Sequence, residues 1–212
     1  MDIIFETFQH LLDPDWIMNN GGLYLVLIIL FIETGLFFGF FLPGDPLLFV
    51  SGVVIASSDG TYPFSYDILN LTFWMLLFMI STILGNFFGY WFGNKFVYLF
   101  NRKEDTWFLK RKHIDAAHEF YGSQGGFAIA IARFLPIVRT FAPILAGTVK
   151  MDFKKFTFYN IIGAIIWVGS LTSLGYVLGD NPWVKSNLEY VIIGIVLIVT
   201  LPVIFKLVLK KK

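Results

Sequence analysis

The sequence predicts an all-α integral membrane protein, arranged as an inverted repeat with two opposed re-entrant helical segments and an N-terminal interfacial helix. The chain is 57% hydrophobic and only 15% charged, and its mean hydropathy of +0.71 lies far outside the range of soluble domains. Two apolar stretches are interrupted by similar proline-containing motifs. These are "FLPGDP" at 41–46 and "FLPIVRTFAP" at 134–143. No lysine or arginine precedes Lys95, whereas eight acidic residues do. This asymmetry of charge orients the chain in the membrane.

The first repeat is expected at about 21–100, after a short amphipathic helix at 1–20. In that helix apolar residues recur at helical spacing among acidic ones, which is typical of a helix lying in the membrane interface. The apolar run from Gly22 to about Ile55 is too long for one span. We read it as a helix followed by a shorter re-entrant arm with its tip at 43–46. A span from about Ile68 to Phe100 follows.

The second repeat is expected at about 116–180, with its re-entrant tip at 136–143. Bases flank its apolar block on both sides, so both flanks are cytoplasmic by the positive-inside rule and the block enters and returns. A span from about Phe156 to Leu178 then leads outward. A final span at 188–206 returns to the lysine-rich C-terminus, which is therefore cytoplasmic. Residues 21–212 thus form a single polytopic membrane domain.

Two pairs of motifs recur in the same order along the chain. "FLPGDPLLFVSG" at 41–52 aligns with "FLPIVRTFAPILAG" at 134–147, and "GYWFG" at 89–93 aligns with "GYVLG" at 175–179. The G-Y-x-x-G match alone is explained by the small residues through which membrane helices pack. Both pairs together favour an inverted repeat, and inverted repeats with broken helices that meet near the midplane are a transporter architecture.

Four ionisable residues lie inside the apolar blocks: Glu33, Asp45, Arg133 and Arg139. Each costs about 2.5 to 3.5 kcal/mol at the bilayer centre, so pairing or a wet cavity is needed. Because the first repeat holds the acids and the second the bases, we expect them to meet. Guanidinium binds phosphate bidentately. This predicts phosphate binding at Arg133 and Arg139 and proton coupling at Glu33 and Asp45. The alternative is a pair of purely structural salt bridges.

Irregular backbone at the two tips should free N–H groups that favour an anion. The residues that shape these tips are Pro43, Gly44, Pro46, Pro136, Pro143 and Gly147.

The sequence contains no cysteine and no catalytic triad, phosphate loop or metal cluster. We therefore expect neither an enzyme nor a cofactor or metal site, and no nucleic-acid partner. GxxxG-like spacing at Gly85, Gly89 and Gly93 permits a homodimer without requiring one.

Glu33 followed by "FLPGDP", then "RFLPIVRTFAPILAG" and "GYVLG", resembles the DedA family of bacterial membrane proteins over roughly residues 20–180. This family is related to the eukaryotic VTT or SNARE-associated domain. The resemblance implies an inner-membrane transporter with two opposed re-entrant helices. It also implies flipping of the carrier lipid undecaprenyl phosphate toward the cytoplasm for reuse in cell-envelope synthesis, driven by the proton motive force.

The functional positions of the family carry over to Glu33, Asp45, Arg133 and Arg139. Many members have P-G-E or a second acid near the first tip, whereas this chain has a single aspartate in "PGDP". The number of coupled protons is therefore open. The resemblance implies polyprenyl phosphate, membrane phospholipids and protons as partners. The alternatives are a proton-coupled ion or small-solute antiporter, a less selective phospholipid scramblase, and a membrane scaffold.

Overall fold

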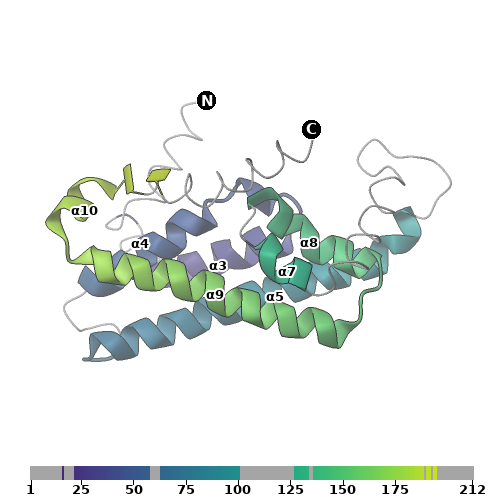
Figure 1. The fold of residues 1–212 in the computed structure, drawn as a ribbon, viewed down its shortest axis with the longest axis horizontal. Helices are drawn as coiled ribbons and strands as arrows, with labels where there is room; N and C mark the ends of the chain where they lie inside the picture. Colours follow the sequence, from purple (N-terminus) through teal and green to yellow (C-terminus); the bar gives the residue numbers. More distant parts are fainter. Residues whose placement is uncertain are drawn as a thin grey trace. The chain divides into compact units, whose positions relative to one another are not determined.

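A computed structural model of the protein describes Trp16, residues 22–57, 63–100, 127–133 and 136–188, and residues 190, 191, 193 and 194. The predicted interfacial helix at 1–20, apart from Trp16, lies outside these residues, as do the base-rich segment at 101–126 and most of the final span at 188–206. In the described ranges the chain is helical, as predicted (Figure 1). The helices are α3 Gly22–Gly35, the 3-10 helix η1 Gly39–Phe41, α4 Gly44–Ser57, α5 Asp67–Phe100, α7 Phe127–Ala132, α8 Pro136–Thr148, α9 Phe153–Gly179 and α10 Pro182–Ser186.

Two of these helices are long and apolar enough to cross a membrane. They are Asp67–Lys95 of α5, with 29 residues, and Phe153–Gly179, which is α9, with 27 residues. At about 1.5 Å of rise per residue each exceeds the roughly 30 Å of a hydrocarbon core. The spans predicted at 68–100 and 156–178 are therefore confirmed to within a few residues.

The first apolar stretch breaks earlier than predicted. Helix α3 ends at Gly35, η1 follows, and α4 begins at Gly44. Gly44, Asp45 and Pro46 form the first turn of α4, so the irregular backbone precedes them, and a re-entrant tip at 43–46 stays a prediction. Proline is accepted in a first turn, where its missing N–H would have had no partner within the helix.

The second stretch breaks between α7 and α8, where Arg133 follows the last residue of α7. Pro136 opens α8, the position at which proline suits a helix best. The break predicted at Pro136 is present, whereas the one predicted at Pro143 is not, since Pro143 and Gly147 both lie within α8. A re-entrant tip at 136–143 stays a prediction. Pro143 is accommodated because it packs next to Gly89, which presents no side chain, and membrane helices tolerate interior proline.

The described residues divide into two compact units. The first unit comprises residues up to Leu30, Leu42–Ser81 and residues from Ile165 onward, and the second comprises Phe31–Phe41 and Thr82–Ala164. Each unit has its own apolar core. The first core includes Leu47, Phe49, Trp74, Phe78 and Trp167, and the second includes Tyr90, Ile129, Ala142, Ala146 and Phe156.

Helices α4 and α9 pack through glycines in the first unit. Gly175 of α9 lies against the backbone carbonyl of Phe49 in α4, and Gly52 of α4 lies against the backbone of Thr172 and Tyr176. A Cβ atom at either glycine would overlap with main-chain atoms, which cannot move aside as a side chain could. The two helix backbones therefore approach as closely as small residues allow.

Helices α5 and α8 pack in the same way in the second unit. Gly93 of α5 lies against the carbonyl of Ile144 in α8, and Gly147 of α8 lies against the carbonyl of Tyr90 in α5. In each unit, a G-Y-x-x-G helix of one predicted repeat thus meets the arm of the other repeat. The paired motifs that predicted the repeat have the same packing role in both units.

The face of α5 that carries Gly85, Gly89 and Gly93 is occupied within the chain itself. Gly85 lies against Gly35 and Thr34. Gly89 lies beside Pro143, and Gly93 against Ile144. This glycine face therefore serves packing within the chain, and a homodimer stays a prediction.

Candidate functional site

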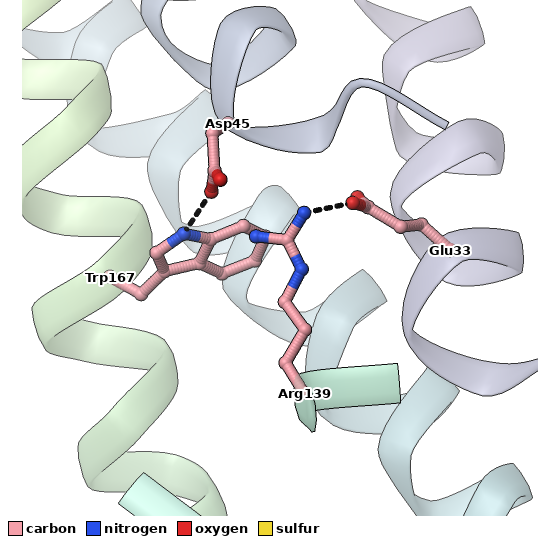
Figure 2. Close-up of polar contacts among 4 residues, drawn as sticks. All are labelled: Glu33, Asp45, Arg139 and Trp167. Carbon is pink, nitrogen blue, oxygen red and sulfur yellow. Dashed lines mark hydrogen bonds and ion pairs between the residues drawn. The ribbon is translucent and has the colours of Figure 1, made fainter. Parts of the chain in front are cut away.

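Glu33 and Arg139 form a buried ion pair in the second unit. Nη2 of Arg139 donates a hydrogen bond to Oε1 of Glu33, as Figure 2 shows. The two side chains are only 0% and 5% exposed. The sequence predicted that an acid of the first broken stretch would meet a base of the second, and this pair confirms it.

Local backbone geometry explains how Glu33 is presented. Glu33 lies in the last turn of α3, and the chain folds back over it at Gly39, whose position leaves no room for a Cβ beside the backbone of Ile32 and Glu33. Arg139 lies at the start of α8, directly after the break that Pro136 ends. Both charged groups are thus set on helix ends beside irregular backbone.

Arg133 is bound by carboxamides. Its Nη2 donates to Oδ1 of Asn160 in α9 at 2.5 Å, and Nδ2 of Asn86 in α5 donates to the same oxygen at 2.8 Å. With the Asn86 carboxamide turned over, its oxygen accepts from Nη2 of Arg133 at 2.9 Å and its nitrogen donates to the carbonyl of Thr34 at 3.1 Å. Arg133 is 2% exposed, Asn86 2% and Asn160 0%. In the first orientation Asn86 is linked to the guanidinium through Asn160, and in the second it accepts from the guanidinium directly.

The sequence prediction missed both asparagines. The available signal was their position, since Asn86 in "GNFFG" and Asn160 in "YNIIG" are polar residues within membrane-spanning helices. A polar side chain inside the membrane tends to face the protein interior and bond there. That rule, applied to uncharged residues as well as charged ones, selects both.

Asp45 lies in the first unit, in the first turn of α4, where a carboxylate complements the helix dipole. It accepts a hydrogen bond from Nε1 of Trp167 in α9 at 2.7 Å (Figure 2). Asp45 is 6% exposed and Trp167 2% exposed. Sequence reasoning missed Trp167, because a tryptophan in an apolar helix is normally read as packing alone.

Replacing Trp167 with phenylalanine should destabilise the first unit. Phenylalanine retains much of the apolar contact but removes the N–H donor to Asp45, and a buried hydrogen bond to a charged group contributes about 1.5 to 3 kcal/mol. Thermal unfolding of the purified protein in one detergent measures this. Trp183→Phe is the control, because the Trp183 side chain is 62% exposed. Equal small shifts for the two variants would contradict the proposed importance of the Asp45 contact.

The second unit brings together Glu33, Arg133 and Arg139, three of the four predicted ionisable residues. The like charges of the two arginines interact electrostatically. Glu33 holds, on Arg139, the position that an external anion would take, because carboxylate and phosphate are recognised by guanidinium in the same way. Among the residues that the structure describes, no group of His, Asp or Glu is arranged to hold a metal ion. The roles of the tip prolines and glycines in binding remain predictions.

Together these features define an α-helical membrane protein with ionisable groups buried in its apolar interior. Residues 42–177 match the VTT domain family. The chain is 37% identical to Protein DedA of Escherichia coli K12 over 219 aligned residues, covering 100% of the chain and 97% of that protein. It is 35% identical over 184 residues to the inner membrane protein YqjA of the same strain, covering 84% of the chain and 76% of YqjA.

An uncharacterized membrane protein of Mycobacterium tuberculosis H37Rv is 34% identical over 208 residues, covering 95% of the chain and 88% of that protein. No solved structure matches the chain. The chain belongs to the DedA family of VTT-domain membrane proteins.

Proposed function

We propose that this protein flips undecaprenyl phosphate, a polyprenyl phosphate carrier lipid, across the bacterial cytoplasmic membrane for recycling in cell-envelope synthesis, coupled to protons. The observation that carries the proposal is the buried pair of Glu33 and Arg139 in a DedA-family membrane protein. A guanidinium that binds an anion away from water is the group needed to draw a lipid phosphate into the protein. The small phosphate headgroup needs only a narrow polar slot, while the polyprenyl tail remains in the bilayer.

The proposed mechanism is competition between the Glu33 carboxylate and the lipid phosphate for the Arg139 guanidinium. An arriving phosphate competes with Glu33 for Arg139, and Arg133 provides a second guanidinium in the same unit. The displaced carboxylate would then lie in a low-dielectric interior without this partner, a state that favours uptake of a proton. Phosphate binding and protonation of Glu33 are thereby linked, and linkage is reciprocal. Asp45 is the second proton-coupling residue of the proposal.

The proposal includes two opposed re-entrant arms related by an inverted repeat, with the C-terminus in the cytoplasm. The recurrence of glycine contacts in both units supports the repeat, because each FLP arm packs against a G-Y-x-x-G helix. The bases that flank the second broken stretch support the orientation. Inner-membrane localisation is supported by the relative YqjA, which is named as an inner membrane protein.

A reconstituted flipping assay tests the function. Purified protein in liposomes is offered undecaprenyl phosphate and, in parallel, undecaprenol, which lacks the phosphate. We expect the protein to accelerate movement of the phosphate lipid alone, and Arg139→Ala to abolish it. Lys154→Ala is the matched control, because it removes an exposed positive charge at the start of α9.

Three results would contradict the proposal. Equal movement of both lipids would identify a less selective scramblase. Flux of protons or small ions without lipid movement would identify an antiporter. Unchanged flipping in Arg139→Ala would remove the assigned role of the guanidinium.

A further inference from the structure

We infer that the turn between α8 and α9 binds an anionic phospholipid of the surrounding bilayer, with Lys150 and Lys95 holding the phosphate of its headgroup. This site is separate from the buried ion pair and does not depend on the proposed function. One membrane-spanning stretch ends at Lys95 and another begins at Phe153. The turn at 149–152 and the end of α5 therefore lie at the bilayer surface, where phospholipid headgroups are.

Close packing of α8 on α5 brings the two lysines to the same end of the second unit. A Cβ atom at Gly147 of α8 would lie 2.8 Å from the backbone nitrogen of Asn94 in α5. Lys150 donates its backbone N–H to the carbonyl of Gly147 at 3.1 Å, and Lys95 follows Asn94 directly. Both lysines are exposed. Two long, flexible side chains thus start from neighbouring backbone and can converge on one phosphate.

Hydrogen bonds hold the turn, and Lys150 occupies it at a conformational cost. Lys150 has a φ of 53°, the one positive φ among the described residues other than glycine. Its N–H and that of Met151 bond to the carbonyls of Gly147 and Ala146, a helix ending that usually has glycine at this position. The Tyr90 hydroxyl donates to the carbonyl of Met151 at 2.6 Å, which fixes the turn to α5. Because the backbone alone favours glycine, the Lys150 side chain calls for a role of its own.

Aromatic side chains accompany the two lysines. Phe153 is 52% exposed, although its ring also packs on those of Tyr90 and Phe156. Trp91 is 50% exposed, and the ammonium of Lys95 lies 4.8 Å from the centre of its indole ring. Lysine and aromatic residues together are typical of the membrane–water interface, where the ring lies among the lipids and the ammonium reaches the headgroups. The surface therefore fits a lipid better than a free anion, because it also offers apolar contact.

The acidic residue of the turn leaves this surface positive. Asp152 caps α9 by accepting a hydrogen bond from the backbone N–H of Lys155 at 2.9 Å. The start of α9 thus already has its partner, and the lysine ammonium groups, not the helix end, are the anion-binding groups. Residues 150–155 contain three lysines and one acid, so the segment keeps a net positive charge.

The experiment titrates phosphatidylglycerol, or neutral phosphatidylcholine, into the full-length protein in neutral detergent micelles. Native mass spectrometry measures lipid affinity, and thermal unfolding measures stability. Wild-type protein should bind phosphatidylglycerol more tightly than phosphatidylcholine. Lys150→Gly should be at least as stable as the wild type without lipid, because glycine suits the turn. It should nevertheless bind phosphatidylglycerol about fivefold more weakly, which is the worth of one base beside an anionic membrane.

Lys95→Gln provides a second test, because it removes the other charge and leaves the turn unchanged. It should give a similar loss of phosphatidylglycerol affinity, about fivefold. Lys150→Arg, which keeps the positive charge, should bind like the wild type.

Lys154→Ala is the matched control. Phe156 packs on Tyr90 of α5, with ring centroids 4.6 Å apart. At about 100° per residue, Lys154 therefore lies on the opposite side of α9 from α5. This variant removes an exposed lysine of the same segment and should bind phosphatidylglycerol like the wild type.

Several results would overturn the inference. Wild-type protein without preference for phosphatidylglycerol, or a Lys150→Gly protein that binds it like the wild type, leaves no site at the turn. A loss in Lys154→Ala as large as in Lys150→Gly would show an effect of net charge alone. Inorganic phosphate that raises the unfolding temperature as much as phosphatidylglycerol would exclude a lipid site. None of these measurements uses undecaprenyl phosphate, so this inference and the proposed function fail separately.

Discussion

Glu33→Ala should lower the free energy of unfolding by about 3 to 5 kcal/mol, because it removes the carboxylate from a buried guanidinium. Arg139→Ala should cost a similar amount by stranding the carboxylate. Removing both groups should cost less than the two single losses together, since neither charge is then left without the other. A double-mutant cycle on unfolding in mixed detergent micelles measures the coupling, which should reach about 1 kcal/mol or more for residues in direct contact.

Asp180→Ala is a suitable control for loss of one acidic group, since Asp180 is exposed beyond the end of α9. It should leave stability within about 0.5 kcal/mol of the wild type. Additive effects of Glu33→Ala and Arg139→Ala in the double variant would show that the two groups are not coupled. The competition between Glu33 and phosphate would then have no basis.

Gly175→Ala and Gly93→Ala should each destabilise the protein by about 3 kcal/mol, at the upper end of overpacking costs. The new Cβ would overlap with the carbonyl of Phe49 in the first case and of Ile144 in the second, so whole helices must separate. The backbone cannot relieve this overlap by changing a rotamer. The same detergent unfolding measurement, with size-exclusion chromatography to assess folding, records the loss.

Gly169→Ala is the control within α9. A Cβ at Gly169 would meet only the end of Met75 at 3.7 Å and of Met79 at 3.9 Å, which are ordinary contacts. Because alanine favours helix over glycine by about 0.8 to 1 kcal/mol, this variant should be neutral or stabilising. A Gly175→Ala protein as stable as Gly169→Ala would show that the close approach of α4 and α9 is not needed.

Features that depend on length and charge were predictable from the sequence. The spans of α5 and α9 follow from apolar runs longer than a bilayer is thick. That an acid of the first stretch meets a base of the second follows from the cost of an isolated charge there, although the particular pair of Glu33 and Arg139 was not predicted. The positions at which the helices break could not all be predicted from length and charge. Proline marks a place where a helix can begin, as at Pro136, but it also lies inside a helix, as at Pro143. Pro143 packs beside Gly89 of α5, a contact between distant parts of the chain that the local sequence does not show.

The neutral members of the polar network were harder to predict for a related reason. Asn160 and Trp167 carry no charge, so neither shows the energetic penalty that marks a charged residue in an apolar stretch. Their roles depend on which helix faces them, and that is set by contacts between distant parts of the chain. The sequence therefore predicts the charged groups of the site, whereas the groups that orient them emerge from the fold.

The close contact between α4 and α9 has a consequence for biogenesis. Phe49 and Gly52 are synthesised long before Gly175, so the ribosome has delivered nearly all of the membrane domain before the first unit can close. Until then the face of α4 that packs against α9 is exposed to the translocon or to lipid. Contacts between segments far apart in the sequence form slowly. A premature stop anywhere ahead of α9 should thus yield an inserted but incomplete chain, recognisable to membrane quality-control proteases.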